Sequence, residues 1–115
     1  MKDVNGELRY KDKIIKYVFN LNVMEAIQDE YGTLDEWGAL TDGTKGEVNA
    51  KAIIFGFTEM INEAVDMKND DEGTNDPHYT HKQVGRMITE IGIENAAVNM
   101  NKTIVDSTRV ESKNE

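Results

Sequence analysis

The sequence predicts a mainly α-helical α+β fold, with an N-terminal β-hairpin followed by about four to five helices in one compact domain. Two patterns and the chain length predict this class. Apolar residues alternate with polar ones near the N-terminus, whereas from about residue 22 onward they recur at steps of three and four. At 115 residues the chain has the length of one domain, which we place at residues 1–107. The polar end, residues 108–115, is expected to be a flexible tail.

The hairpin is expected over roughly residues 7–20. Apolar side chains occupy alternate positions in its second half, at Ile15, Tyr17, Phe19 and Leu21. Lys11-Asp12 marks a turn between the two strands, and Asn5-Gly6 is a second turn signal. A lone hairpin is marginal in water, so the face that carries Tyr17 and Phe19 should pack on helices or on another chain.

Helix start and stop signals divide the rest of the chain into helices. A capping residue is followed three positions later by Glu or Gln at Asn22, Thr33 and Thr80. Glycine ends two of these helices, at Gly32 and Gly92. The expected helices run from Asn22 to Tyr31, over 34–40, from Glu47 to Met67, over 81–91 and over 93–107.

The central helix, Glu47 to Met67, is the element around which the others should be organised. A broad apolar stripe from Ile53 to Met67 predicts an ordinary core face. A second apolar group, on the other side of the first half, needs further cover. That group consists of Val48, Ala52, Phe55 and Gly56. Either the chain's own hairpin and the helix with Trp37 cover it, or another protein does.

We expect a protein–protein interface at this second group and at two further aromatic residues. The candidate interface residues are Val48, Ala52, Phe55, Gly56, Tyr17 and Trp37. Val98 and Val105 form another apolar pair off the main stripe of the last helix, and Ile14 and Val18 lie opposite the main face of the hairpin. The alternative is that a layered fold buries all of these side chains.

Composition narrows the function classes. The chain has 13 basic and 22 acidic residues and a net charge of −9, and its basic residues are scattered along the sequence. Nucleic-acid binding is disfavoured, because phosphate contacts need Lys and Arg gathered on one face. The absence of cysteine excludes disulfides and thiolate metal sites. There is no apolar run long enough to span a membrane and no signal peptide, so we expect a cytoplasmic protein.

No constellation of residues predicts an active site or a metal site. A polar, acidic loop is expected at 69–77, but it lacks the ligand order of an EF-hand calcium loop. His78 and His81, with Asp76 nearby, lack the further ligands that zinc requires. Phosphate-binding, dinucleotide-binding and hydrolase motifs are missing from the sequence. We therefore expect a protein that is not an enzyme and that has no cofactor.

The order of features resembles that of a known family. Residues 19–32, FNLNVMEAIQDEYG, read as a strand that runs directly into a helix and stops at glycine. A short helix with Trp37 follows, then the long apolar helix with the FGF triplet at 55–57, and then the segment QVGRMI at 83–88. Over about residues 7–107 this order is similar to that of the small tail assembly chaperones of long-tailed bacteriophages, the siphophage type.

The resemblance implies a non-enzymatic assembly factor that binds the tape measure protein, keeps its helices soluble and helps to recruit tail tube subunits. It implies action in the host bacterial cytoplasm, absence from the finished virion and, in many members, a longer frameshifted form extended beyond 108–115. Coating a long client would also require self-association through a repeating contact. The main alternative is another small phage structural or adaptor protein, of the head–tail connector type, which stays in the virion. The negative charge disfavours a DNA-binding regulator.

Overall fold

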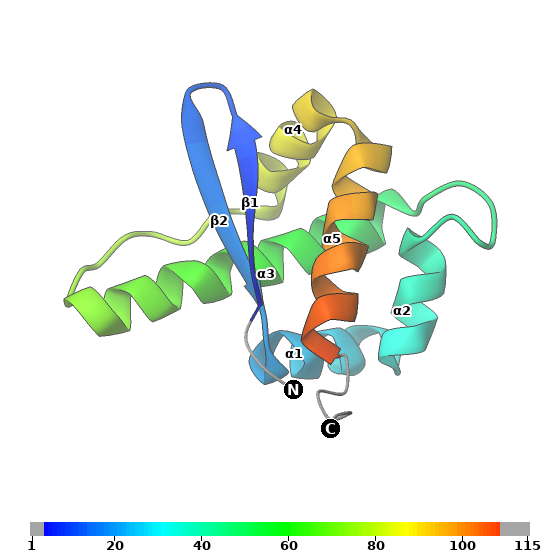
Figure 1. The fold of residues 1–115 in the computed structure, drawn as a ribbon, viewed down its shortest axis with the longest axis horizontal. Helices are drawn as coiled ribbons and strands as arrows, with labels where there is room; N and C mark the ends of the chain where they lie inside the picture. Colours follow the sequence, from blue (N-terminus) through cyan, green and yellow to red (C-terminus); the bar gives the residue numbers. More distant parts are fainter. Residues whose placement is uncertain (1–3, 109–115) are drawn as a thin grey trace.

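A hairpin precedes the helices in the computed structural model, which describes residues 4–108 (Figure 1). The elements are β1 (Val4–Tyr10), β2 (Lys13–Phe19), α1 (Leu21–Tyr31), α2 (Leu34–Thr41), α3 (Ala50–Glu72), α4 (His81–Ile91) and α5 (Ile93–Thr108). The predicted class is therefore confirmed. The radius of gyration over Cα atoms is 14.0 Å, close to the value of about 13 Å expected for one folded domain of this length.

The two strands form an antiparallel ladder that ends with Tyr10 opposite Lys13. The predicted turn at Lys11-Asp12 is confirmed, and Lys11 adopts a left-handed conformation with a φ of 54°. The hairpin begins earlier than predicted, because β1 already starts at Val4.

The second predicted turn, at Asn5-Gly6, is wrong, because both residues lie within β1. Gly6 is the ladder partner of Tyr17. A Cβ atom at Gly6 would lie 2.1 Å from Cζ of Tyr17. The Tyr17 ring therefore covers the glycine, and a larger residue at position 6 would clash with the ring. Gly6 therefore serves cross-strand packing, a role that glycine takes where another group approaches the backbone closely.

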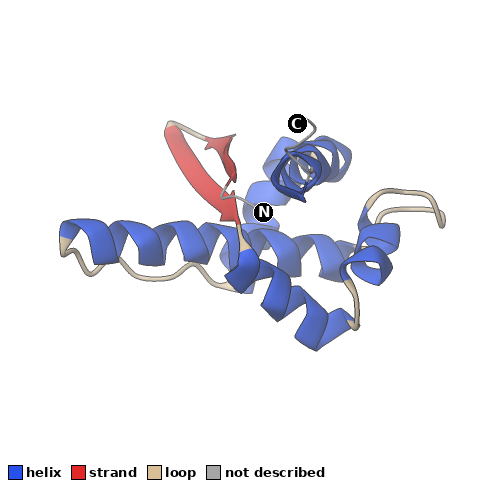
Figure 2. Ribbon diagram, turned by 60° about the horizontal axis from the view of Figure 1, so that its bottom comes forward, coloured by secondary structure: helices blue, strands red, loops and turns tan. Residues whose placement is uncertain are grey.

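Helix α3 is the central element, as predicted. It packs on β2 and on each of the other four described helices, and β1 is the one described element that it does not contact. The hairpin and α5 lie on one side of α3, and α1 lies on the other (Figure 2). Helix α3 therefore carries side chains into every part of the core.

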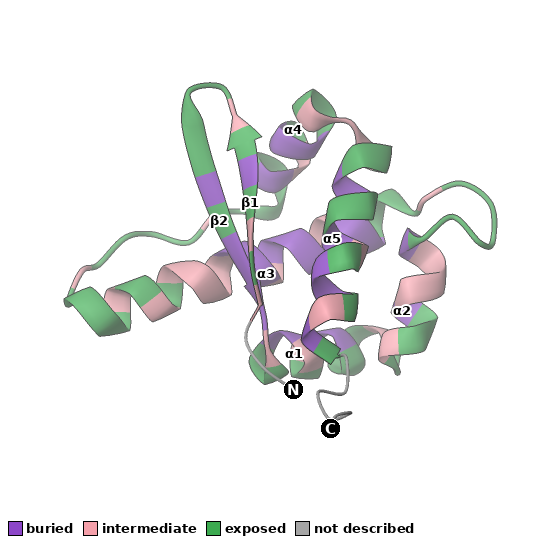
Figure 3. Ribbon diagram, in the orientation of Figure 1, coloured by how far each residue is buried: buried purple, intermediate pink, exposed green. Residues whose placement is uncertain are grey.

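The core includes the first part of the predicted apolar stripe of α3, from Ile53 to Ile61. Its fully buried members, at most 1% exposed, are Ile53, Phe57, Met60 and Ile61. Burial fades towards the C-terminal end of the helix (Figure 3), where Ala64 and Met67 are only half-buried. This end projects beyond the hairpin and the other helices (Figure 1). The predicted core stripe is therefore too long at its C-terminal end.

Two predicted helix starts are corrected. Helix α1 is capped by Asn20 rather than Asn22, since Oδ1 of Asn20 accepts hydrogen bonds from two backbone N–H groups of the first turn at 3.1 and 3.3 Å. Helix α3 starts after Asn49 rather than at Glu47, since Oδ1 of Asn49 accepts a hydrogen bond from a first-turn N–H at 2.9 Å. Both caps satisfy backbone donors that the helix itself leaves unpaired.

The predicted loop at 69–77 is shorter than expected. Helix α3 continues past Met67 to Glu72, and it ends at Gly73, which adopts a left-handed conformation with a φ of 68°. Asn and Asp residues at the end of the pattern suggested a loop, but glycine at the C′ position sets the true end of the helix.

Residues 74–80 run back along α3, and two asparagines of the helix hold them there. Asn62 donates to the backbone oxygen of Tyr79 at 3.0 Å and accepts from its backbone nitrogen at 2.8 Å. Asn69 bonds the backbone of Asp76 in the same two-way manner, at 3.0 and 2.9 Å. The segment is therefore attached to α3 through its backbone.

The remaining helix signals are confirmed. Thr33 caps α2, and Thr80 caps α4, where Gln83 completes a reciprocal capping box. Helix α5 includes Thr108, which corrects the predicted start of the tail at residue 108, and residues 109–115 lie outside the described residues. In the described part of the chain, no helix combines the length and the apolar character needed to cross a membrane.

Candidate protein-interaction surfaces

Tyr17, a predicted interface residue, lies inside the fold. It is 2% exposed, and its ring meets that of Phe57 edge-on with the centroids 5.2 Å apart. Its hydroxyl shares a hydrogen bond of 3.2 Å with Oγ1 of Thr103 on α5. Burial raises the pKa of Tyr17, and the Thr103 hydrogen bond partly opposes the rise. The hairpin therefore packs on the helices of its own chain.

Trp37 of α2 covers the second apolar face of α3. Its side chain is 1% exposed, and Nε1 donates a hydrogen bond to the backbone oxygen of Ala52 at 2.9 Å. A Cβ atom at Gly56 would lie 2.4 Å from Cζ2 of Trp37 and 3.2 Å from the sulfur of Met100. The indole ring therefore lies against the glycine, one helical turn after Ala52.

Four of the six predicted interface residues are thus core residues, namely Tyr17, Trp37, Ala52 and Gly56. The interface prediction is corrected for these four, because the chain's own hairpin and helices already cover them. Val18, which was expected on the outer face of the hairpin, is 1% exposed, whereas Ile14 is 51% exposed. The sequence pattern alone could not distinguish intramolecular from intermolecular cover.

Phe55, the fifth predicted interface residue, is half-buried in an aromatic cluster at the surface. Its ring centroid lies 5.6 Å from that of Tyr31 and 6.3 Å from that of His81. The Tyr31 hydroxyl has no hydrogen-bond partner among the described residues. Burial, and to a smaller extent the charge of Glu30, raises the pKa of Tyr31. Phe55 therefore links α3 to α1 and α4, and part of its side chain stays exposed to solvent.

Val48, the sixth, lines an open groove of about 540 Å³ between the α2–α3 loop and α5, here called the valine groove. Its apolar lining residues are Val48, Ala97 and Val98, and its acidic lining residues are Asp42, Glu47 and Glu94. Val98 is 67% exposed, and Val105, two helical turns further along α5, is 56% exposed. The structure thus brings together two apolar groups, at 48 and 98, that lie far apart in the sequence.

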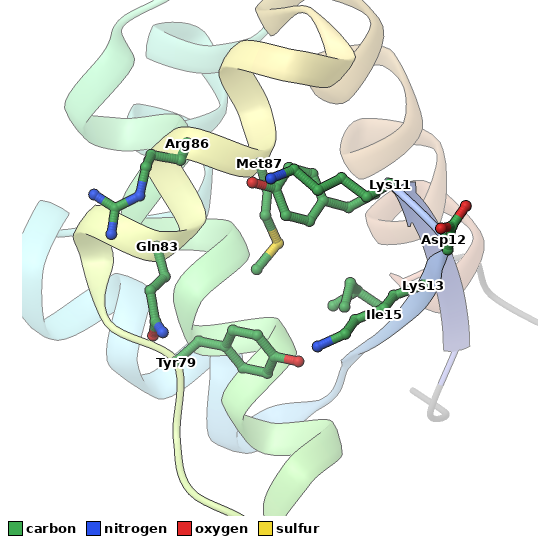
Figure 4. Close-up of a pocket in the computed structure, with 9 residues that line it drawn as sticks. Lys11, Asp12, Lys13, Ile15, Tyr79, Gln83, Arg86 and Met87 are labelled. Atoms are coloured by element: carbon green, nitrogen blue, oxygen red, sulfur yellow. The ribbon is translucent and has the colours of Figure 1, made fainter.

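A second groove of about 480 Å³ lies between the hairpin and α4, here called the basic groove (Figure 4). The residues that line it are Tyr10, Lys11, Asp12, Lys13, Ile15, Tyr79, Gln83, Arg86 and Met87. The polar ends of Lys13 and Tyr79 point towards one another across it, whereas Asp12 points away (Figure 4). The groove combines two tyrosines, an apolar base and three cations.

The basic groove carries cations that no described carboxylate pairs with. Among the described residues, Lys11, Lys13 and Arg86 take part in no ion pair. The ammonium of Lys11 lies 5.3 Å from the centroid of the Tyr10 ring. Sequence reasoning missed this site, because it treated the basic residues as scattered. The one available signal was the pair of lysines at the hairpin turn, Lys11 and Lys13.

The histidines do not form a metal site with the acidic side chains. Nε2 of His78 lies 2.7 Å from Oδ1 of Asp66, and both side chains are exposed, while His81 lies beside Phe55. Within residues 4–108, no group of three or more His, Asp or Glu side chains is arranged to hold a metal ion. The valine groove and the basic groove are two surfaces of the described chain that offer distinctive chemistry.

Comparison of the chain with protein-family models, with curated proteins and with solved structures yields no match. The features of the molecule that bear on its function are therefore the sequence pattern, the fold and the two grooves.

Proposed function

We propose that this protein is a non-enzymatic assembly chaperone of the kind found in long-tailed bacteriophages, which binds the tape measure protein and helps to recruit tail tube subunits. The order of a hairpin, a capped helix, a short tryptophan helix and a long central helix supports the proposal, because the resemblance rests on that order. The observation that carries it is the exposed Val98 and Val105 pair on α5, of which Val98 lines the valine groove.

The valine groove fits an amphipathic helix as its client. Val98 and Val105 are seven residues apart on one face of α5, and Val48 extends the apolar surface sideways from it. A helix that lays its apolar face into such a groove is held by anchors at helical spacing. The acidic lining, Asp42, Glu47 and Glu94, favours a client whose apolar stripe is flanked by Lys or Arg.

The charge of the chain suits the chaperone role. A net charge of −9 keeps a protein with exposed apolar side chains dispersed, since like-charged copies repel one another. The chaperone would act in the cytoplasm of the infected bacterium and be absent from the finished virion. The main alternative, a head–tail connector protein, would be retained there.

Co-expression with the tape measure protein of the same genome tests client binding. The wild-type chain should raise the soluble fraction of the tape measure protein, and Val98→Glu should abolish the gain, because it places a charge in the apolar contact. Leu21→Glu is the matched control, since Leu21 is as exposed as Val98, at 66%, but lies on α1. Equal solubilisation by wild type and Val98→Glu would contradict the proposed client surface.

Mass spectrometry of purified virions separates the chaperone from the connector. The chaperone proposal expects the protein in infected-cell lysates and not in mature particles. Its presence there at a fixed number per particle would favour the connector. The coding DNA offers an independent check, since a slippery heptamer near the stop codon would indicate the frameshifted longer form.

A further inference from the structure

The basic groove continues into a second, apolar groove on the same side of the molecule. The two share Ile15 and Tyr79 as lining residues. The second groove, about 400 Å³, lies between β2 and the projecting half of α3, and it is here called the isoleucine groove. Its apolar lining residues are Ile14, Ile15, Ile61, Ala64 and Val65, and its charged lining residues are Lys16, Lys68, Glu72 and Asp76. Lys68 and Asp76 pair with one another. Ile14 is 51% exposed, so this face has apolar surface without cover in the monomer.

The C-terminal end of α3 forms an acidic projection at the far end of the isoleucine groove. Asp70, Asp71 and Glu72 are exposed, and none of them forms an ion pair with a described residue. Glu72 also lines the isoleucine groove. The last turn of α3 has no basic residue, so the helix dipole adds to the negative charge there. These three residues are called the acidic helix end.

Within one chain the acidic helix end cannot reach the basic groove. The isoleucine groove lies between them, and Figure 1 shows α3 projecting to one side while the hairpin tip and α4 lie above it. The three cations of the basic groove and the acidic helix end, of which Glu72 lines the shared face, therefore lie on either side of a mainly apolar strip. Such a face is complementary to itself when a second copy is turned about a two-fold axis.

We propose that this face binds a second copy of the chain. The acidic helix end of each protomer lies in the basic groove of its partner, and the two isoleucine grooves, with Ile14, meet between them. The contact is made twice, so it closes as a dimer. The inference does not rest on the proposed function, because the valine groove lies on α5 and stays open to a client in the dimer.

The charge distribution favours a second copy over a nucleic acid. A nucleic acid long enough to use all three cations would run from the basic groove towards Glu72 and its neighbours, which repel phosphate. Two chains of net charge −9 repel one another, but at physiological salt this repulsion is largely screened between charges more than about 8 Å apart. Charges in direct contact across an interface are screened far less, so the local pairs determine the register.

Reciprocal charge reversal tests the dimer. The groove variant carries Lys11→Glu and Lys13→Glu, and the helix-end variant carries Asp71→Lys and Glu72→Lys. All four positions are exposed, and lysine near a helix C-terminus is favourable, so both variants should fold. Sedimentation of the wild type should give twice the monomer mass of 13.0 kDa. Each variant alone should weaken the dimer about tenfold or more.

Mixing the two variants is the decisive measurement. In the mixture both contacts become attractive again, so a heterodimer of wild-type affinity should form, although each variant alone dimerises more weakly. The control is Lys45→Glu with Lys102→Glu, which changes the net charge by the same amount as the groove variant. These two lysines line neither groove of the face, so the dimer should stay intact.

Three results would overturn the inference. One is a monomeric wild type at concentrations up to about 1 mM. Another is no recovery on mixing. The third is a mass that keeps rising with concentration, since an open chain of copies is not two-fold pairing. A failure here would leave the client-binding experiment unaffected, because that experiment measures Val98.

Discussion

The indole nitrogen of Trp37 donates a hydrogen bond to the backbone oxygen of Ala52 while the ring lies against Gly56, one turn further along the same helix. A short helix of eight residues, α2, is thereby attached to the central helix by one large side chain. The pair explains why glycine occupies the middle of a long helix, where it normally costs stability.

The Gly56→Ala substitution should therefore destabilise the fold, although alanine is the better helix former. The new Cβ would lie 2.4 Å from Cζ2 of Trp37, an aromatic carbon with no freedom to withdraw. We expect a loss of about 1–3 kcal/mol in the free energy of unfolding, the usual cost of overpacking, measured by urea denaturation. Gly38→Ala is the control, because nothing lies within 4 Å of its Cβ position. It should be neutral or stabilising by up to about 1 kcal/mol.

Alkaline pH should destabilise the protein through Tyr17. Burial raises its folded-state pKa above the ordinary value of 10.0, so the folded state holds the phenolic proton more tightly than the unfolded state does. The resulting stability is fully present below pH 10 and is lost as the pH rises through the folded-state pKa. Denaturation midpoints measured between pH 8 and pH 11 should fall for the wild type and fall less for Tyr17→Phe. A matching decline in both proteins would contradict this role; Tyr31, whose pKa is also raised, accounts for part of the remaining slope.

Loss of the Asn62 side chain should loosen the segment at 74–80 around Tyr79 without unfolding the domain, while Asn69 still holds Asp76. Asn62 makes two hydrogen bonds to the backbone of Tyr79, and each such bond contributes about 0.5–1.5 kcal/mol. In Asn62→Ala, amide hydrogen exchange should become faster at Tyr79 and at its neighbours. Exchange in β2 should remain slow. Uniformly faster exchange across the chain would show that Asn62 supports the whole core instead.

The client surface should be separable from stability. Val98 and Val105 are more than half exposed, and exposed positions usually tolerate substitution within about 0.5 kcal/mol. Thermal unfolding of Val98→Glu with Val105→Glu should therefore match that of the wild type within a few degrees. A large drop in the melting temperature would mean that these valines support the fold, and the solubilisation assay would then need a milder substitution.

The parts of the fold that depend on local chemistry could be predicted from the sequence. The Thr80 and Gln83 capping box is a contact between residues three apart, so the start of α4 was predicted correctly. The period-two pattern likewise predicted β2. The C-terminal end of α3 was predicted less well. Its asparagine and aspartate residues suggested a loop, but they remain helical up to Glu72, and Gly73 caps the helix.

The candidate sites depend on contacts between distant residues, which a sequence pattern does not contain. The cover of Gly56 by Trp37 and the meeting of Val48 with Val98 arise only once the helices have packed. An apolar residue on a helix face predicts that some other element covers it. The pattern does not identify which element that is. The basic groove was missed for the same reason, since Arg86 and Lys13 are far apart in the chain.

The hydrogen bond between Tyr17 and Thr103 spans 86 positions of the chain. During synthesis the hairpin leaves the ribosome first and α5 leaves last among the described elements. Until α5 arrives, the Tyr17 hydroxyl has no Thr103 to bond, and the strands that carry it are too few to be stable alone. Folding should therefore be held back until nearly the whole domain has been made, and a nascent chain arrested before α5 should remain sensitive to protease along its full length.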